Sequence, residues 1–347
     1  MTERTKPPLR VVVAGLGYFS QFHLAAWHRH PGAELTGLCD TSVTRLQAEA
    51  APRGLIGERD LAAVLMQVPA DIVDIVAPPS AHAALIRSAL APGRIIICQK
   101  PFCQSIAEAR ALIAEADRHG TQVVIHENFR FQPWHRTIKA FLKGSRMGQV
   151  YQARFALRPG DGRGPEAYLA RQPAFQTMPR LLLHETGVHF IDLFRWFFGE
   201  ISDVYAETRR LNPAIAGEDA GTMTLRHRSG VLSVFDGNRL SDHVADNLRH
   251  TMGEMVIEGE GGTLTLGGDG RVSFRPFGST VAETVPLIAP VQEDSFGGGC
   301  VAALIDHVVQ SAQAGVMPEN TAAHYLHVMT VTEAAYRSAD QGCRVTV

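Results

Sequence analysis

Between Leu9 and Ile125 the chain alternates short, near-continuous apolar runs with segments of helical character. Continuous apolarity, rather than strict alternation of apolar and polar residues, is typical of strands buried on both faces, as in parallel sheets. Repeated alternation of such strands with helices predicts a doubly wound α/β domain with right-handed crossovers. The runs that we interpret as strands are Arg10–Ala14, Glu34–Cys39, Ile72–Ala77, Ile95–Cys98 and Gln122–Ile125.

Beyond Pro133 the pattern changes, and strand-like stretches from Val204 to Phe274 are separated by hairpin signals such as Ser229-Gly230 and Gly261-Gly262. These stretches predict an antiparallel sheet. We therefore expect a Rossmann domain over residues 1–126 and an α+β domain with a mainly antiparallel sheet over residues 127–347. The other elements expected in the second domain are helices at Pro133–Leu142, Leu181–Phe198, Cys300–Ala314 and Ala322–Ala339, a strand at Gln149–Leu157 and a loop at Arg158–Pro179.

Length, charge and cysteine content exclude several classes of protein. At 347 residues the chain is longer than one core usually supports, which favours two domains. The net charge is −2, with no block of like charge to bind nucleic acid or an anionic membrane, and no apolar stretch approaches the ~18 residues of a membrane span. Met1–Pro8 lacks the apolar core of an export signal, so we expect a short disordered leader. The five scattered cysteines predict no disulfide framework and a reducing cytoplasm.

Two glycines, Gly15 and Gly17, follow the first predicted strand and precede a helical stretch. Glycines at this place allow a tight turn and the close approach of a dinucleotide diphosphate to the helix N-terminus. Ser20 stands where the usual G-x-G-x-x-G pattern has its third glycine, which is a mild departure because serine is also small. Glycine pairs occur in ordinary strand–helix turns as well, but this context favours a cofactor turn.

Asp40 ends the second predicted strand, where a carboxylate can accept a hydrogen bond from an adenosine ribose. Because a carboxylate repels a 2′-phosphate, NAD is favoured over NADP. Alternatively, Asp40 serves only as the N-cap of a helix over Ser42–Ala50. Arg45 could pair with Asp40, stack on adenine, or partly accommodate NADP, so NADP stays open.

Lys100 directly follows another buried strand and precedes Pro101. Ligands of open parallel sheets bind outside the carboxyl ends of the strands, so a lysine here can hydrogen-bond a substrate oxygen. The alternative is a solvated lysine at a strand end.

His184, Glu185 and His189 lie on the predicted helix Leu181–Phe198. The zinc-binding His-Glu-x-x-His pattern needs histidines four apart, whereas His184 and His189 are five apart, about 140° round an α-helix. We therefore predict no metal site. Glu185 and His189 are four apart and share a face, which is typical of an oriented general base, although a structural carboxylate–histidine pair would look the same.

Together these segments resemble the Gfo/Idh/MocA oxidoreductases, the family of glucose–fructose oxidoreductase and inositol dehydrogenase. The resemblance covers nearly the whole chain and implies a C-terminal domain with an open-faced sheet, a homodimer or homotetramer built through that sheet, and NAD(P)-linked chemistry on sugars, cyclitols or related polyols. The segments that carry it are Gly15–Ser20, Val73–Pro79 followed by His82, Gln99-Lys100-Pro101, Glu127–Arg130, Gly187–Leu193, Gly253–Gly259 and Glu333–Ser338.

The resemblance also implies roles for individual residues. Lys100 corresponds to the catalytic lysine, His189 to the proton acceptor, and Glu185 to an aspartate four residues before that histidine. Two departures leave the substrate open: Gln99 stands in place of a glutamate, which removes an anion beside Lys100, and Glu185 reaches one methylene further than aspartate. The full predicted cofactor site comprises Gly15, Gly17, Tyr18, Phe19, Ser20, Asp40, Arg45, Ala77, Pro78, Ser80, His82, Gln99, Lys100 and Asn128, and the predicted substrate site comprises Lys100, Arg130, Arg158, Arg171, His184, Glu185 and His189.

The sequence thus predicts an enzyme in which hydride passes between nicotinamide and a substrate carbon while His189 takes the hydroxyl proton and Lys100 polarises the oxygen. An aldose such as D-apiose, oxidised to its lactone, is one conceivable substrate. The loop arginines could bind a carboxylate, but their number equally suits a neutral polyol. Two alternatives stay open: an enzyme that uses tightly bound NAD transiently, for glycoside cleavage or sugar interconversion, and a non-catalytic NAD(P)-sensing regulator.

Overall fold

The computed structural model describes residues 6–347, so the first five residues of the expected leader lie outside it. The chain divides into two compact units, one of Met1–Asn128 with Val301–His327 and the other of Phe129–Cys300 with Val328–Val347. The predicted boundary at residue 126 thus falls two residues before the first unit ends. The segment Val301–His327, which the sequence placed in the second domain, returns to the first unit because the Ile125 N–H donates to the Asn320 carbonyl at 2.8 Å.

The first unit is built on a six-stranded parallel sheet with the order β3-β2-β1-β4-β5-β6, which confirms the predicted doubly wound α/β fold. The order reverses at β1 and β4, so the ends of these strands open the crevice in which such folds bind their ligands. β3 is a short edge strand that the sequence pattern did not reveal. The strands are β1 Leu9–Ala14, β2 Ala33–Cys39, β3 Ile56–Glu58, β4 Ile72–Ile75, β5 Ile95–Gln99 and β6 Gln122–His126, and the helices are α1 Ser20–Arg29, α2 Val43–Glu49, α3 Leu61–Gln67, α4 Pro79–Ala89, α5 Ile106–Arg118 and α8 Cys300–Ala314.

The central strands of this sheet form the core of the first unit. Val11–Val13 on β1 and Ile96–Cys98 on β5 are fully buried, as their unbroken apolar sequences require. Short polar side chains cap three of the helices around the sheet: Ser42 caps α2, Asp60 caps α3 and Ser105 caps α5. Ser105 accepts the Glu108 N–H at 3.1 Å and so caps α5, as Ser-x-x-Glu capping boxes do.

The second unit contains a nine-stranded sheet with the order β14-β13-β12-β11-β7-β10-β9-β8-β15. All neighbouring strands pair antiparallel except β7 and β10, so the prediction of a mainly antiparallel sheet is confirmed. The strands are β7 Val150–Leu157, β8 Ile201–Arg209, β9 Ala220–His227, β10 Leu232–Asn238, β11 Gly253–Gly259, β12 Gly262–Leu266, β13 Val272–Pro276, β14 Glu283–Val285 and β15 Val345–Thr346.

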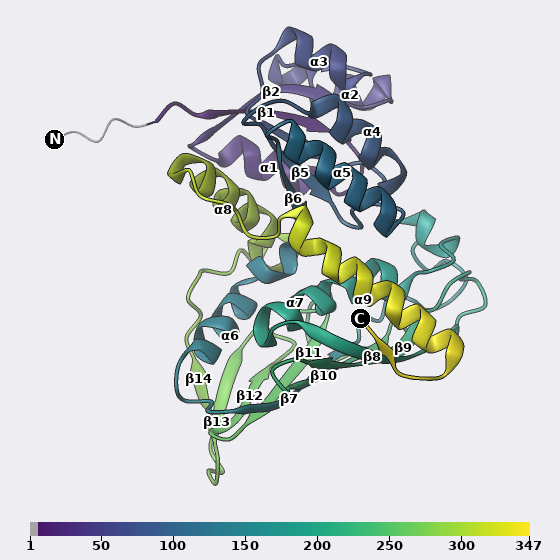
Figure 1. Ribbon diagram of the computed structural model, residues 1–347, viewed down its shortest axis with the longest axis vertical. Helices are drawn as coiled ribbons and strands as arrows, with labels where there is room; N and C mark the ends of the chain where they lie inside the picture. The colour runs from purple at the N-terminus through teal and green to yellow at the C-terminus, as the bar shows by residue number, and fades with distance from the viewer. Residues whose placement is uncertain (1–5) are drawn as a thin grey trace, which may run out of the picture. The chain divides into compact units, whose positions relative to one another are not determined.

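Two helices, α6 (Pro133–Lys143) and α7 (Val188–Phe198), lie along one face of this sheet (Figure 1). Burial alternates along β10, where Ser233, Phe235 and Gly237 point inward. α7 is apolar almost all round and packs Phe190 against Phe155 and Phe235 of the sheet. α9 (Ala322–Gln341) begins in the first unit and ends in the second. Within residues 6–347, no helix is both long and apolar enough to cross a membrane.

Candidate active site

The glycine turn after β1 contains two glycines that the structure uses differently. Gly15 has φ +101°, and a Cβ there would lie 2.4 Å from the Val76 carbonyl oxygen, so the fold itself requires glycine. At Gly17 an added Cβ would meet no protein atom within 4 Å. The absence of a side chain at Gly17 therefore leaves open space, which is what a closely approaching diphosphate needs.

The start of α1 also fits a diphosphate. Phe19, at the N-cap position, offers no side-chain oxygen to the first N–H groups, and the first turn carries no acidic residue. Ser20 is buried, and its hydroxyl donates to the Gly17 carbonyl at 2.6 Å. The first turn of α1 therefore has neither a side-chain cap nor a carboxylate of its own to compete with a bound diphosphate.

Asp40 is buried at the end of β2 and holds the glycine turn. Its Oδ2 accepts the Leu16 N–H at 2.7 Å and its Oδ1 accepts the Ser42 N–H at 2.8 Å. Arg45 Nη1 lies 3.7 Å from Oδ2. The side-chain cap of α2 is Ser42, whose hydroxyl accepts the Arg45 N–H. Asp40 therefore orders the turn around Leu16, a role that the sequence reasoning missed.

The loops after β4 and β5 are joined by His82. Its two ring nitrogens lie 2.8 Å from the Ala77 carbonyl oxygen and 3.0 Å from that of Phe102, and burial lowers its pKa. Pro78 and Ser80, in the same stretch, are exposed, whereas Asn128 is buried at the end of the first unit. Lys100 is half-buried directly after β5, and its N–H donates to Gln99 Oε1 at 3.3 Å. The predicted cofactor residues of the strand ends thus lie on connected loops.

In the second unit, the prediction of one α-helix over Leu181–Phe198 is wrong for its first third, because Leu182–Gly187 forms a π-helical turn before α7 begins. The 140° separation of His184 and His189 assumed for an α-helix does not hold there. The π-helical turn is held by hydrogen bonds to a residue that lies far away in the sequence. The Glu218 carboxylate accepts the N–H groups of Leu181 at 3.2 Å and Leu183 at 3.1 Å.

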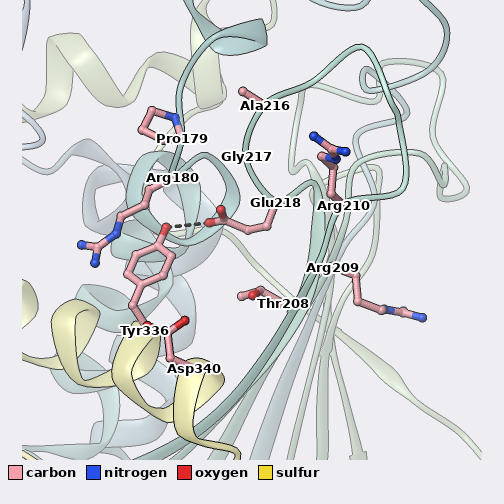
Figure 2. Close-up of a pocket in the computed structure, with 10 residues that line it drawn as sticks. All are labelled: Pro179, Arg180, Thr208, Arg209, Arg210, Ala216, Gly217, Glu218, Tyr336 and Asp340. Atoms are coloured by element: carbon pink, nitrogen blue, oxygen red, sulfur yellow. Dashed lines mark hydrogen bonds between the residues drawn. The ribbon is translucent and has the colours of Figure 1, made fainter.

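Tyr336, on α9, completes this support of the π-helical turn. Its hydroxyl accepts the His184 N–H at 3.1 Å and donates to Glu218 at 2.6 Å, and burial raises its pKa. Figure 2 shows the hydrogen bond between Tyr336 and Glu218 among the residues that line a pocket. The pocket has a volume of about 390 Å³, and the guanidinium carbon of Arg180 lies 4.2 Å from the centroid of the tyrosine ring. Residues far apart in the sequence therefore fix the segment that carries Glu185.

His189 is buried near the start of α7, and its ring stacks on Phe129 with 3.9 Å between ring centroids and 1° between planes. Arg130, the next residue, forms a buried two-pronged ion pair with Asp192, at 2.5 and 2.6 Å. Phe129 and Arg130 together hold one face of α7 and fix the plane of the His189 ring.

Glu185 is held by a residue that the sequence reasoning missed, Arg239. Glu185 Oε2 accepts the Thr186 hydroxyl at 2.8 Å, and that hydroxyl accepts Arg239 Nη1 at 2.8 Å. Arg239 is 2% exposed and also pairs with Asp161 at 3.0 Å. Burial alone would lower the pKa of Arg239, but the charges of Asp161 and Glu185 raise it overall. The sequence contained one signal for this role. Arg239 continues the alternation that places every second residue of β10 on the inner face of the sheet.

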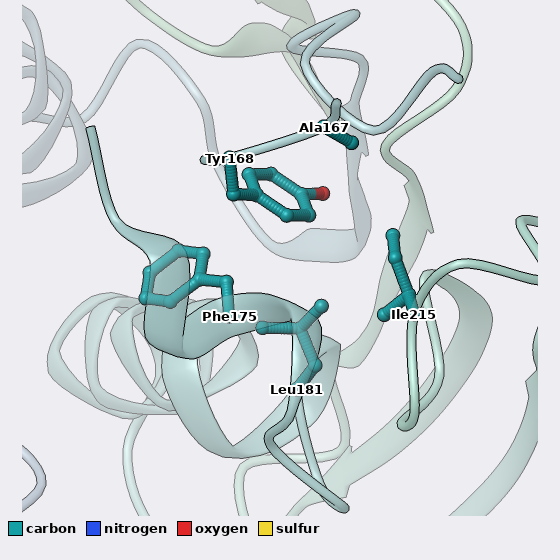
Figure 3. Packing of buried hydrophobic residues seen from close by; sticks show 5 residues of the cluster. All are labelled: Ala167, Tyr168, Phe175, Leu181 and Ile215. Atoms are coloured by element: carbon teal, nitrogen blue, oxygen red, sulfur yellow. The ribbon is translucent and has the colours of Figure 1, made fainter. Parts of the chain in front are cut away.

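The loop over residues 158–180 contributes Ala167, Tyr168 and Phe175 to a small hydrophobic cluster. Leu181 and Ile215, from outside the loop, complete this cluster (Figure 3). The guanidinium carbon of Arg239 lies over the Tyr168 ring, 5.1 Å from its centroid. The predicted loop arginines are paired within the protein: Arg158 with Asp236 at 2.7 Å and Arg171 with Asp161 at 3.1 Å. Packing and ion pairs therefore give this loop a defined shape.

The two glycines give a direct test of the cofactor turn. Gly17→Ala is expected to fold with the melting temperature of the wild type but to lose at least tenfold in NADH affinity, because its methyl group would occupy only the open space. Gly15→Ala, the matched variant, is expected to lower the melting temperature through its clash with Val76. Differential scanning fluorimetry and a NADH fluorescence titration measure both effects. Unchanged NADH binding by Gly17→Ala would contradict the assignment.

A 3-2-1-4-5-6 parallel sheet with such a glycine turn defines the class as NAD-binding Rossmann proteins. The family model described as "Oxidoreductase family, NAD-binding Rossmann fold" matches residues 9–127, and that of the GFO/IDH/MocA C-terminal domain matches residues 135–265. The chain belongs to the Gfo/Idh/MocA family and is an NAD-dependent oxidoreductase acting on CH–OH groups.

Individual relatives extend over the whole chain. D-apiose dehydrogenase of Paraburkholderia graminis is 33% identical over 98% of this chain and 90% of its own, and that of Rhizobium rhizogenes is 29% identical over 98% and 97%. An oxidoreductase from Agrobacterium radiobacter, crystallised with NAD+, L-tartaric acid and magnesium, is 26% identical, with a TM-score of 0.88 over 97% of this chain and 98% of that one.

Proposed function

We propose that this enzyme oxidises an aldose of the D-apiose type at its anomeric CH–OH group, giving the lactone and NADH. The observation that carries this proposal is the end-to-end similarity to D-apiose dehydrogenases, at 33% identity over 98% of the chain. The anomeric CH–OH group of a cyclic aldose has one hydrogen on the carbon and one on the oxygen. Removing the first as hydride and the second as a proton leaves the lactone carbonyl.

The charge balance of the loop over residues 158–180 supports a neutral substrate. Arg158, Arg171 and Arg180 each pair with a carboxylate, those of Asp236, Asp161 and Glu333 respectively. A paired guanidinium has less to gain from a substrate carboxylate than a solvated one has. A sugar held by hydrogen bonds suits this loop better than a sugar acid does.

The site residues divide the chemical work. NAD supplies the hydride acceptor when bound. We assign His189 as the base that takes the hydroxyl proton, since stacking on Phe129 fixes its ring plane. Lys100 donates to the same oxygen and polarises it, and Glu185, oriented through Thr186 and Arg239, accepts from a neighbouring hydroxyl. Asp40 accepts from the adenosine ribose in addition to ordering the turn.

The test is a panel of D-apiose, other aldoses, cyclitols and L-tartrate, each with NAD and with NADP, read at the NADH absorbance band. We expect turnover with D-apiose or a related aldose and NAD, and a lactone product by NMR. If only tartrate is turned over, the substrate is a hydroxy acid and the proposal of a neutral sugar is wrong. If no substrate changes the NADH absorbance and the protein keeps NAD(H) bound through gel filtration, transient use of bound NAD would be favoured.

We also propose a homodimer or homotetramer in a reducing cytoplasm. In support, Tyr151 on β7 exposes half of its side chain, and the five cysteines are all free, four of them buried. Light scattering after gel filtration measures the oligomeric state, and a monomer would refute the proposal.

A further inference from the structure

Four buried polar side chains form a chain of hydrogen bonds inside the first unit. Asp74 Oδ2, on β4, lies 2.7 Å from His23 Nδ1, on α1. The other ring nitrogen of His23 lies 3.0 Å from Gln99 Nε2, at the end of β5. Gln99 Nε2 also lies 3.2 Å from His126 Nδ1, at the end of β6. None of the four is more than 9% exposed, so water cannot replace these partners.

The orientation of the Gln99 amide follows from its third neighbour. The Lys100 N–H, which can only donate, lies 3.3 Å from the Gln99 oxygen. Rotating the amide by 180° would point its NH2 group at that N–H and leave two donors facing each other. The NH2 group therefore faces the two imidazoles and has one hydrogen for each.

This orientation determines where the histidine protons lie. An imidazole nitrogen that accepts from Gln99 carries no hydrogen, so His23 Nε2 and His126 Nδ1 are bare. His23 then holds its single proton on Nδ1 and donates it to Asp74, which also accepts the Trp27 indole N–H at 2.7 Å. The two histidines therefore hold their protons on opposite ring nitrogens.

A glutamate, which the family pattern has at this position, would not satisfy the two imidazoles as Gln99 does. A carboxylate at residue 99 has no hydrogen to donate, so both imidazole nitrogens would face lone pairs. His126 could restore one hydrogen bond by moving its proton to Nδ1. His23 donates its proton to Asp74, so it could restore the other only by taking up a second proton. Glutamine satisfies both imidazoles without any added proton.

We propose that Gln99 is a positioning residue: its NH2 group fixes these two tautomers, and its amide oxygen holds the backbone of Lys100. Gln99 joins the ends of β5 and β6 to α1 through one amide, whose oxygen holds the Lys100 N–H. The part of this inference that concerns Lys100 rests on the proposed function, whereas the assignment of the tautomers does not.

Long-range ¹H–¹⁵N NMR of protein labelled with ¹⁵N-histidine tests the tautomers without cofactor or substrate. We expect a protonated Nδ1 and bare Nε2 for His23, and the reverse for His126, each assigned by its own histidine-to-glutamine variant. The pattern should persist in Lys100→Met, which keeps the backbone N–H, even where that variant is inactive. Protons on His23 Nε2 and His126 Nδ1 would show that the amide is reversed and would overturn the proposal.

The variant Gln99→Glu tests the role in catalysis. It is expected to place a proton on at least one imidazole nitrogen that faces residue 99, and to lower kcat/KM roughly tenfold or more because buried partners lose their hydrogen bonds. Gln99→Met should lower kcat/KM without adding the proton, and Gln47→Glu, exposed on α2, should change neither. Unchanged histidine signals together with wild-type kinetics in Gln99→Glu would refute the proposal. If Gln99→Glu does not fold, the wild-type spectrum still decides.

Discussion

Replacing His189 by phenylalanine is expected to lower kcat by a factor of about 10²–10⁴, the usual contribution of a positioned general base. Phenylalanine keeps a flat ring to stack on Phe129, which lies parallel to the histidine ring at 3.9 Å, but it has no nitrogen to take a proton. The melting temperature and the Kd for NADH should therefore stay close to those of the wild type. Steady-state kinetics on the preferred aldose and a NADH titration measure these quantities.

Two further variants separate proton transfer from packing. His189→Ala loses the stacked ring as well as the base, so its melting temperature should fall below that of His189→Phe. His28→Ala, exposed on α1, is the control and should leave both quantities unchanged. A His189→Phe enzyme with near-normal turnover would remove this histidine from the mechanism.

Replacing Lys100 by methionine is expected to lower kcat/KM by about 10²–10³, the loss typical when one preorganised donor to a reacting oxygen is removed. Methionine keeps most of the length and apolar contact of the lysine stem but none of its donors. Lys143→Met, exposed at the end of α6, controls for the loss of a positive charge and should be neutral. A Lys100→Met enzyme that retained the wild-type rate would shift the role to Arg130 or His184.

The double variant Lys100→Met/His189→Phe shows whether the two residues serve one step. When two groups act as a unit on the same oxygen, removing both lowers the rate far less than the product of the two separate decreases. We therefore expect the double variant to be about as slow as the slower single variant. Fully multiplicative losses would indicate that Lys100 and His189 act on different steps or different atoms.

Much of the first unit could be predicted from local sequence. Near-continuous apolar runs identified β1, β2, β4, β5 and β6, because a strand covered on both faces is mostly apolar. Asp74 on β4 is buried as well, and it has hydrogen-bond partners in His23 and Trp27. Only the short edge strand Ile56–Glu58 lacked such a pattern. The glycine turn was equally visible, although the different reasons for Gly15 and Gly17 emerged only from the atoms around each one.

The candidate substrate residues were harder to interpret, because their surroundings come from distant parts of the chain. Glu218 and Tyr336 support the π-helical turn from 37 and 152 positions away along the sequence. Arg239 lies 53 residues beyond Thr186, to which it donates. Gln99 looked like the loss of a charge beside Lys100 until the structure placed His23 and His126 on either side of its amide.

Taken alone, the sequence determined the kinds of layer in this protein and the chemical groups available to it, because periodicity and turn chemistry act over a few neighbouring residues. Only the tertiary structure decided how those groups are held: which carboxylate orders the glycine turn, which guanidinium fixes Glu185, and which nitrogens carry the histidine protons. Those outcomes depend on hydrogen bonds between segments far apart in the chain, and a buried polar group takes whichever partner the fold brings to it.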